Sequence, residues 1–186
     1  MKYINYASRG MKFEQLINYT NTIYANNNFA LIQKIPTPIR PVSTNKKDKT
    51  ISLAYFERKS TVDYIGVFQG QPLCFDAKET KLKNLPLRNV QEHQINFMDK
   101  FAQQKGLSFL LIHFLFNDTY FCLPFKTLKK FLLDKNGPKS ISYDKFKYQV
   151  FKKGKYVLDY LDTIKKMLCI CRRGNAITNQ QPGFNK

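Results

Sequence analysis

Long apolar runs are absent from this chain of 186 residues. The longest candidate, residues 109–116, contains His113 and has the length of a strand rather than of a bilayer-spanning helix. The first ten residues also lack the apolar stretch of a secretory signal. These absences predict a soluble, cytoplasmic protein without a membrane partner.

Acidic residues are scarce. The chain has 13 Asp and Glu against 31 Lys and Arg, which gives a formal net charge of +18. So large a surplus indicates a polyanionic partner, and nucleic acid is the first candidate because phosphate contacts release condensed counterions. A membrane surface is the alternative, but we find no basic amphipathic helix with an aromatic apolar face. Charge alone does not separate a specific DNA-binding protein from ribosomal-type basic proteins.

Cysteine is also scarce, with four residues in all. Cys74 and Cys122 lie inside apolar runs, which favours a place in the core. Cys169 and Cys171 form a C-x-C pair, but a zinc site would need two further ligands at suitable spacing. The cysteines therefore predict neither a metal site nor disulfides, as is typical of a reducing compartment.

Hydrophobic residues make up 43% of the chain, enough for one globular core. Their periodicity predicts an α/β domain with a central mixed sheet flanked by helices. We expect a single domain over residues 1–168 and a basic, disordered tail over residues 169–186. The expected helices cover residues 12–24, 91–104, 125–133 and 156–167, and the expected strands cover residues 29–35, 64–68, 73–78, 107–116 and 119–123.

A proline-rich insertion occupies residues 36–55. Three prolines within residues 36–41 exclude a helix and stiffen one arm of the segment. The segment then turns at a hydrophilic tip and returns in extended form, which predicts a protruding hairpin. Its tip is basic, with Lys46, Lys47 and Lys49. A passive surface loop is the alternative interpretation.

Asp63, Asp76 and Lys78 form the candidate catalytic group. Asp76 and Lys78 share one face of a predicted strand because side chains alternate, and the preceding tight turn brings Asp63 alongside. Two carboxylates can hold Mg²⁺, and a lysine can orient water or stabilise charge on a phosphate. By itself the D-x-K pattern also fits a solvated strand end. Candidate phosphate contacts follow directly after it, at Lys81, Lys83 and Arg88.

Several segments, in the same order, resemble the RecU family of Holliday junction resolvases over roughly residues 8–165. They are RGMKFE (residues 9–14), KIPTPIRPV (34–42), AYFERKSTVDYIGVFQGQPLCFDAKET (54–80), PLRNVQEHQINFM (86–98) and NGPKSI (136–141). Two departures stand out. Asp76 occupies a position where the family carries Glu, which shortens the reach of the carboxylate, and Ser8 replaces an Asn.

The resemblance implies a restriction-endonuclease-like fold, a homodimer, and symmetric Mg²⁺-dependent nicking of four-way DNA junctions during recombination and repair, with Mn²⁺ as an alternative ion. Other recombination proteins would be further partners. By position it implies a metal site at Thr61, Asp63, Asp76 and Gln94, with Lys78 as the transition-state lysine. Arg9 is a candidate DNA contact and Glu14 an additional carboxylate. The hairpin corresponds to a stalk that inserts at the junction centre.

Simpler interpretations stay open for individual residues and for the whole chain. Thr61 could cap a turn, and Gln94 could be an ordinary surface amide on a helix. A repair nuclease of the same fold, or a non-catalytic protein that binds branched DNA by its shape, would carry much of the same sequence pattern.

Overall fold

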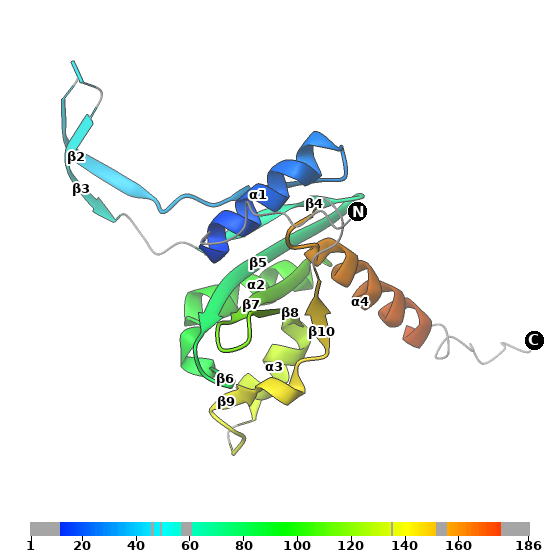
Figure 1. The fold of residues 1–186 in the computed structure, drawn as a ribbon. Helices are drawn as coiled ribbons and strands as arrows, with labels where there is room; N and C mark the ends of the chain where they lie inside the picture. The colour runs from blue at the N-terminus through cyan, green and yellow to red at the C-terminus, as the bar shows by residue number, and fades with distance from the viewer. Residues whose placement is uncertain are drawn as a thin grey trace, which may run out of the picture.

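A six-stranded mixed sheet forms the centre of the computed structural model of the chain (Figure 1). The structure describes residues 12–45, 47–48, 50–56, 61–134, 136–151 and 156–175. The strand order is β1-β4-β5-β7-β8-β10, and every neighbouring pair is antiparallel except β5 and β7, which run parallel. The strands are β1 (Ala30–Lys34), β4 (Tyr64–Phe68), β5 (Gln71–Thr80), β7 (Leu107–Phe114), β8 (Thr119–Pro124) and β10 (Tyr148–Val150).

Helices cover both faces of this sheet. On one face, α1 (Phe13–Asn26) and α4 (Tyr160–Asn175) share a core with Phe75 of β5 and Phe109 of β7. On the other face, α2 (Glu92–Gln103) and α3 (Phe125–Leu133) pack with the alternate residues of the same strands, such as Leu110. Strand β7 is therefore buried on both sides, which explains its continuous apolar sequence.

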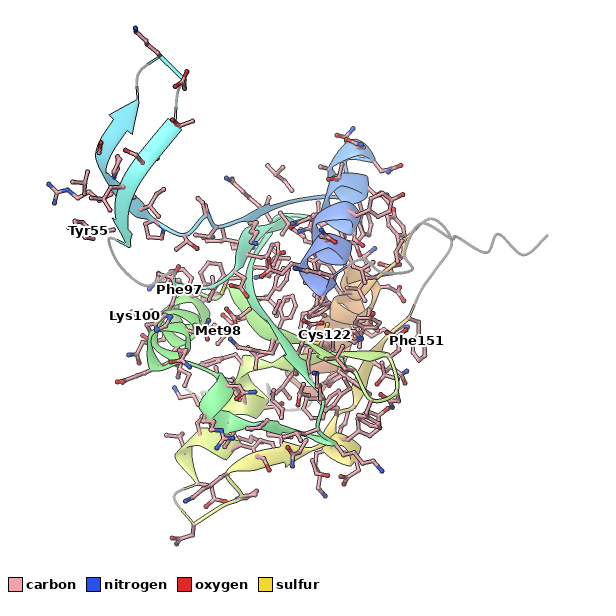
Figure 2. The ribbon with its side chains drawn as sticks, turned by 60° about the vertical axis from the view of Figure 1, so that its left-hand side comes forward. Tyr55, Phe97, Met98, Lys100, Cys122 and Phe151 are labelled. Carbon is pink, nitrogen blue, oxygen red and sulfur yellow. The ribbon has the colours of Figure 1, made fainter. Side chains whose placement is uncertain are left out.

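The expected α/β class with a central mixed sheet is confirmed. Cys74 and Cys122 are buried, as expected of core residues; Figure 2 labels Cys122. Within the described part of the chain, no helix is both long and apolar enough to cross a membrane.

The start of the last helix was predicted wrongly. Residues 156–159 are not helical, and α4 begins at Tyr160 and continues to Asn175. The helix thus extends beyond residue 167, where its end was predicted, and includes residues 169–175 of the segment expected to be a disordered tail. Asp159 explains the later start, because its Oδ1 accepts a hydrogen bond from the Asp162 N–H at 3.3 Å, as an N-cap does. The same oxygen accepts the Tyr24 hydroxyl at 2.9 Å, which ties this helix start to α1.

Short regular elements occupy the basic segment between β5 and α2, where the sequence predicted no helix or strand. The segment contains a short strand, β6 (Asn84–Pro86), which pairs with β9 (Ser140–Ser142), and a 3-10 turn, η2 (Leu87–Asn89). A second 3-10 turn, η3 (Tyr143–Lys145), follows β9. Three-residue strands leave too little periodicity to be recognised in a sequence.

The proline-rich insertion forms a two-stranded hairpin that projects from the body, as predicted (Figure 1). It consists of β2 (Ile39–Asn45) and β3 (Thr50–Phe56), whose register shifts near Pro41, where a proline cannot donate to the ladder. Tyr55 is 64% exposed on this hairpin (Figure 2). Lys47 lies at the tip and is exposed, whereas Lys46 and Lys49 fall outside the described residues.

Candidate functional site

The β4–β5 hairpin brings Asp63, Asp76 and Lys78 together. Asp63 directly precedes β4, and its Oδ2 accepts the backbone N–H of Ala77 in β5 at 2.9 Å. Asp76 and Lys78 flank Ala77 and project from the same face of the strand. The Lys78 Nζ lies 2.6 Å from the Asp76 Oδ2. Two carboxylates and one ammonium thus converge where the sequence predicted it.

The environment of Asp76 disfavours the ionised form of its side chain. Its side chain is fully buried, and its Oδ1 accepts a hydrogen bond from the Gln94 Nε2 at 2.7 Å. Burial and the nearby charge of Asp63 raise the pKa of Asp76, while Lys78 opposes the shift. The Lys78 ammonium is close to Oδ2 without being aligned as a donor, and no other described residue donates to that oxygen.

Gln94 links the carboxylate to the lysine. It is buried at the third position of α2, where its Oε1 accepts the N–H of Gln91 at 3.0 Å in a capping box. The same oxygen accepts the Lys78 Nζ at 3.1 Å. Gln94 is therefore fixed by the helix start and is not a surface amide. Its amide nitrogen, rather than its oxygen, faces Asp76.

These residues fit a hard divalent cation. Among the residues that the structure describes, no group of three or more His, Cys, Asp and Glu side chains gathers into a metal cage. Asp63 and Asp76 nevertheless supply two carboxylates, and Mg²⁺ is commonly held by one or two carboxylates while it keeps several waters. The buried Asp76 Oδ2 without an aligned donor, together with the raised pKa, marks a place where added positive charge would be stabilising.

The remaining candidates are spread around this group. Thr61 is exposed, and no hydrogen bond joins it to Asp63 or Asp76. Glu14 on α1 is exposed and forms an ion pair with Lys34 instead of joining the two aspartates. Arg9 lies outside the described residues. The basic candidates Lys81, Lys83 and Arg88 are all exposed in the segment between β5 and α2.

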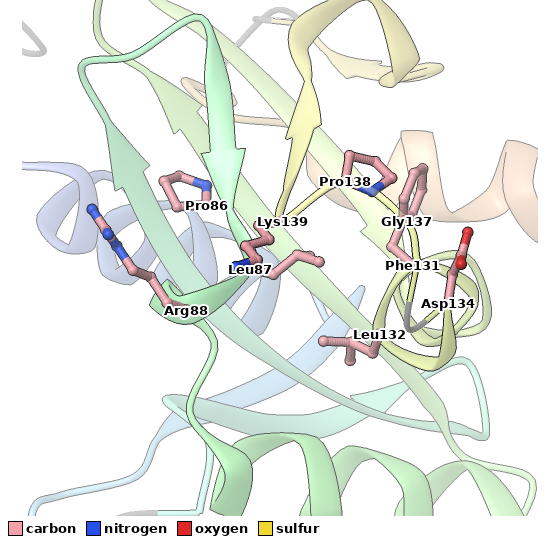
Figure 3. Close-up of a pocket in the computed structure, with 9 residues that line it drawn as sticks. All are labelled: Pro86, Leu87, Arg88, Phe131, Leu132, Asp134, Gly137, Pro138 and Lys139. Atoms are coloured by element: carbon pink, nitrogen blue, oxygen red, sulfur yellow. The ribbon is translucent and has the colours of Figure 1, made fainter.

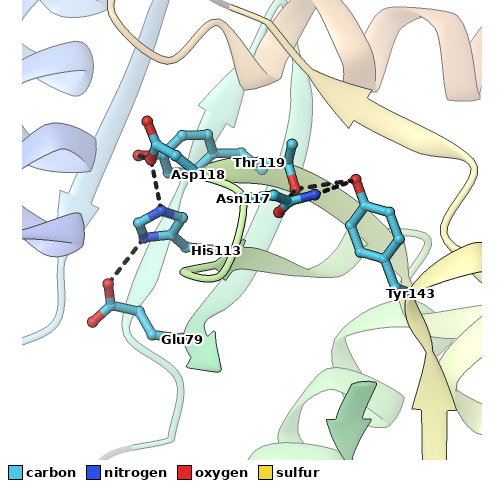
Figure 4. A network of polar contacts seen from close by, with 7 residues as sticks. Glu79, His113, Asn117, Asp118, Thr119 and Tyr143 are labelled. Carbon is cyan, nitrogen blue, oxygen red and sulfur yellow. Dashed lines mark hydrogen bonds and ion pairs between the residues drawn. The ribbon is translucent and has the colours of Figure 1, made fainter. Parts of the chain in front are cut away.

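A polar network around His113 was not anticipated from the sequence (Figure 4). His113 lies on β7, its Nδ1 is 3.1 Å from the Glu79 Oε1, and its Nε2 is 2.9 Å from the Asp118 Oδ1. Its ring stacks on Tyr120, with 4.2 Å between ring centroids. The network ties the end of β5 to the β7–β8 turn and so steadies the strand that carries Asp76. The one sign of this network in the sequence is the presence of a histidine within an apolar run.

We expect the Asp76→Asn variant to be more stable than the wild-type protein in the absence of metal. The pKa of the native carboxyl is raised even with Lys78 present, so ionised Asp76 destabilises the fold. Protonated Asp76 contributes its full stability below the pKa that this carboxyl has in the unfolded chain. The contribution is lost as the pH rises through the higher pKa that it has in the folded protein. At pH 8 the melting temperature of Asp76→Asn should therefore be a few degrees higher than that of the wild type. This corresponds to a gain of about 1 kcal/mol or more in the free energy of unfolding.

Divalent metal should reverse this order of melting temperatures. Added Mg²⁺ is expected to raise the melting temperature of the wild-type protein and to leave that of Asp76→Asn nearly unchanged, because binding to the folded state stabilises it. The exposed Asp144 offers a matched Asp→Asn control outside the site. Equal metal responses of the wild type and Asp76→Asn would count against a metal site at Asp76.

The sequence comparisons identify one protein family. A family model described as Recombination protein U matches residues 8–166. The chain is 42% identical to the Holliday junction resolvase RecU of Oceanobacillus iheyensis, over 77% of this chain and 76% of that protein. It is 41% identical to the protein of the same name from Streptococcus mutans, over 89% of this chain and 87% of that one. Among solved structures, the Holliday junction resolvase Hjc of Archaeoglobus fulgidus is similar at a TM-score of 0.42 and 10% identity, over 70% of this chain and 88% of that one.

Proposed function

The chain belongs to the RecU family of Holliday junction resolvases, and we propose that it is an endonuclease that resolves four-way DNA junctions in recombination and repair by nicking two strands symmetrically. One observation carries the chemistry. Asp63 and Asp76 lie beside Lys78 on the β4–β5 hairpin, with Asp76 buried and oriented by Gln94. A solvated strand end would not bury a carboxylate in this way.

Asp63 and Asp76 are the residues that would hold the metal, and we propose Mg²⁺ as the ion, with Mn²⁺ as a substitute. A cation bound there would polarise the scissile phosphate and lower the pKa of a bound water. Thr61 stays a candidate for an outer position in this metal site. Gln94 orients Asp76 and Lys78 at once, so it fixes the distance between the carboxylate and the ammonium.

Lys78 has two tasks in this mechanism. Its ammonium donates to the Gln94 Oε1 and lies 2.6 Å from the Asp76 Oδ2, which places a positive charge beside the carboxylates proposed to bind metal. Such a charge stabilises the negative charge that develops on the phosphate during hydrolysis. It also orients the attacking water by hydrogen bonding. Because both neighbours are themselves fixed, little reorganisation accompanies the reaction.

Symmetric nicking requires two sites, and we propose that a homodimer supplies them. A two-fold axis relates two copies of the site in a dimer, and a four-way junction has matching pseudo-symmetry. Recognition would rest on the shape of the DNA and on phosphate contacts from Arg9, Lys46, Lys47, Lys49, Lys81, Lys83 and Arg88.

A cleavage assay tests the proposal directly. The wild-type protein is incubated with Mg²⁺ and either a synthetic four-way junction or a linear duplex of the same sequence, and the products are mapped on every strand. We expect paired nicks at symmetric positions on the junction and little cutting of the duplex. Junction binding without any cutting would instead indicate a non-catalytic binding protein, and equal cutting of both substrates would indicate a repair nuclease.

The projecting hairpin, β2–β3, gives a separate prediction. Deletion of residues 43–49 removes its basic tip, and we expect junction affinity to fall by at least about tenfold at physiological salt while linear-duplex affinity falls less. Binding titrations on both DNAs measure this. The exposed Lys47 offers a charge-only control, Lys47→Ala, which should have a smaller effect than the deletion. Equal losses on the two DNAs would contradict insertion of the hairpin at the junction centre.

A further inference from the structure

A pocket beside the nuclease site has no role in the mechanism above (Figure 3). It lies between η2, the end of α3 and the loop that leads to β9, and its volume is about 450 Å³. Leu87, Phe131 and Leu132 line it with apolar surface, and Arg88 and Lys139 supply two cations. The Leu87 N–H donates to the Lys139 carbonyl at 3.0 Å, which joins two walls of the pocket.

Asp134 supplies the pocket's one carboxylate among the described lining residues. Its Oδ1 accepts the N–H of Asn136 at 3.2 Å, so the side chain is folded back over the turn. Gly137 leaves room for it, since a Cβ at that position would lie 2.6 Å from the Asp134 Oδ2. No hydrogen bond from another described residue reaches Oδ2. The pocket wall thus offers an acceptor opposite Arg88.

Three hydrogen bonds connect Arg88 of the pocket lining to the Asp76 carboxylate. The Arg88 carbonyl accepts the Gln91 Nε2 at 3.4 Å, and the Gln91 N–H donates to the Gln94 Oε1 at 3.0 Å. Gln94 in turn donates to Asp76 at 2.7 Å. Arg88, which lines the pocket, is thus joined to the Asp76 carboxylate through Gln91 and Gln94.

We propose that this pocket receives an unstacked nucleobase of the nicked strand, close to the scissile phosphate, and makes cutting depend on that base. The inference rests on the proposed function. Apolar side chains stack on the face of any base, and Arg88 and Lys139 would meet the adjoining phosphates. The Asp134 carboxylate accepts hydrogen bonds only, so it favours bases with an exocyclic amino group over thymine. Unstacking costs least where pairing is already interrupted, as it is near a branch point.

A short peptide from a partner protein is the competing occupant. The two cations would attract an acidic peptide, but Asp134 would repel an acidic side chain that entered the pocket. A nucleobase has no such conflict, because it brings hydrogen-bond donors to the carboxylate and leaves its negative charge outside, at the phosphates. The arrangement of cations at one side and an acceptor at the other therefore favours a nucleotide.

Base unstacking can be measured without cutting. The probe is 2-aminopurine, a fluorescent base that brightens when it leaves the stack, placed in turn at each position within a few nucleotides of the branch point in a synthetic junction. The protein is the full-length Asp63→Ala variant, which leaves the pocket intact. We expect fluorescence to rise severalfold at one position. Leu87→Trp, which fills the pocket, should abolish that rise while junction binding persists, and a flat signal at every position would overturn the proposal.

Base preference gives a second readout. Junctions that carry each of the four bases at the responsive position are cut with wild-type protein, Asp134→Asn and Asp144→Asn, the last being an exposed carboxylate outside the pocket. We expect the preference against thymine to fall roughly tenfold in Asp134→Asn alone. Unchanged preference in Asp134→Asn would exclude the pocket as a base reader, and this is the outcome if a peptide binds there. Failure of the wild type to cut any junction, with the fluorescence rise intact, would refute only the proposed function.

Discussion

Replacement of Asp63 by alanine is expected to lower the rate of junction cutting by roughly 10²–10⁴-fold while junction binding persists. Asp63 supplies one of the two carboxylates of the proposed metal site, and its removal leaves Asp76 as the single anionic ligand. The proposed DNA contacts lie elsewhere, at other basic residues and on the projecting hairpin, so binding is expected to persist. Single-turnover cleavage with saturating protein separates the chemical step from binding.

Asparagine at the same position is the matched control for folding. Asp63 Oδ2 accepts the Ala77 N–H, and an asparagine oxygen can accept it in the same place, whereas alanine leaves that backbone donor without its partner. Asp63→Asn should therefore melt at or above the temperature of the wild type, because it keeps this acceptor and removes the negative charge that opposes ionised Asp76, and it should still lose most cutting. Normal cutting by either variant would refute the assignment of Asp63 as a metal ligand.

Much of the site was accessible from the sequence because it depends on local geometry. Asp76 and Lys78 are two residues apart on one strand, and a tight turn at Gly70, with a φ of 77°, returns the chain past Asp63. Alternation along a strand and the reversal at a turn are both local rules, so the sequence determines this grouping. The projecting hairpin follows from prolines for the same reason.

Other features depend on tertiary packing and could not be predicted locally. The burial of Asp76 and the orientation of Gln94 depend on the docking of α2 against β5. The contacts of His113 with Glu79 and Asp118 need the parallel pairing of β5 with β7. The pocket at Asp134 needs α3 to approach η2. None of these contacts leaves a periodic signal, since the residues lie far apart along the chain.

Lys78→Ala should lower the rate constant for cutting by roughly 10²–10³-fold, the effect of losing a fixed charge-stabilising group from an active site. The ammonium lies against oxygens of Asp76 and Gln94, and no other Lys or Arg in the described part of the chain forms an ion pair with Asp76. Its loss also removes the attraction that lowers the pKa of Asp76, and the pKa of that carboxyl should rise further. The pH profile of the residual activity should therefore shift to higher pH.

Loss of a phosphate-binding charge should have a different effect from loss of a catalytic group, and Lys81→Ala is the control that distinguishes these two effects. Lys81 is exposed one residue beyond β5 and carries the same charge. Its loss should weaken junction binding slightly, with a salt dependence reduced by about one phosphate contact, and leave the saturated cutting rate unchanged. If Lys78→Ala behaved like Lys81→Ala, with weaker binding and a normal saturated rate, Lys78 would be a phosphate contact and not part of the catalytic group. A rate loss at saturation, together with the shifted pH profile, would place its ammonium at the reacting phosphate.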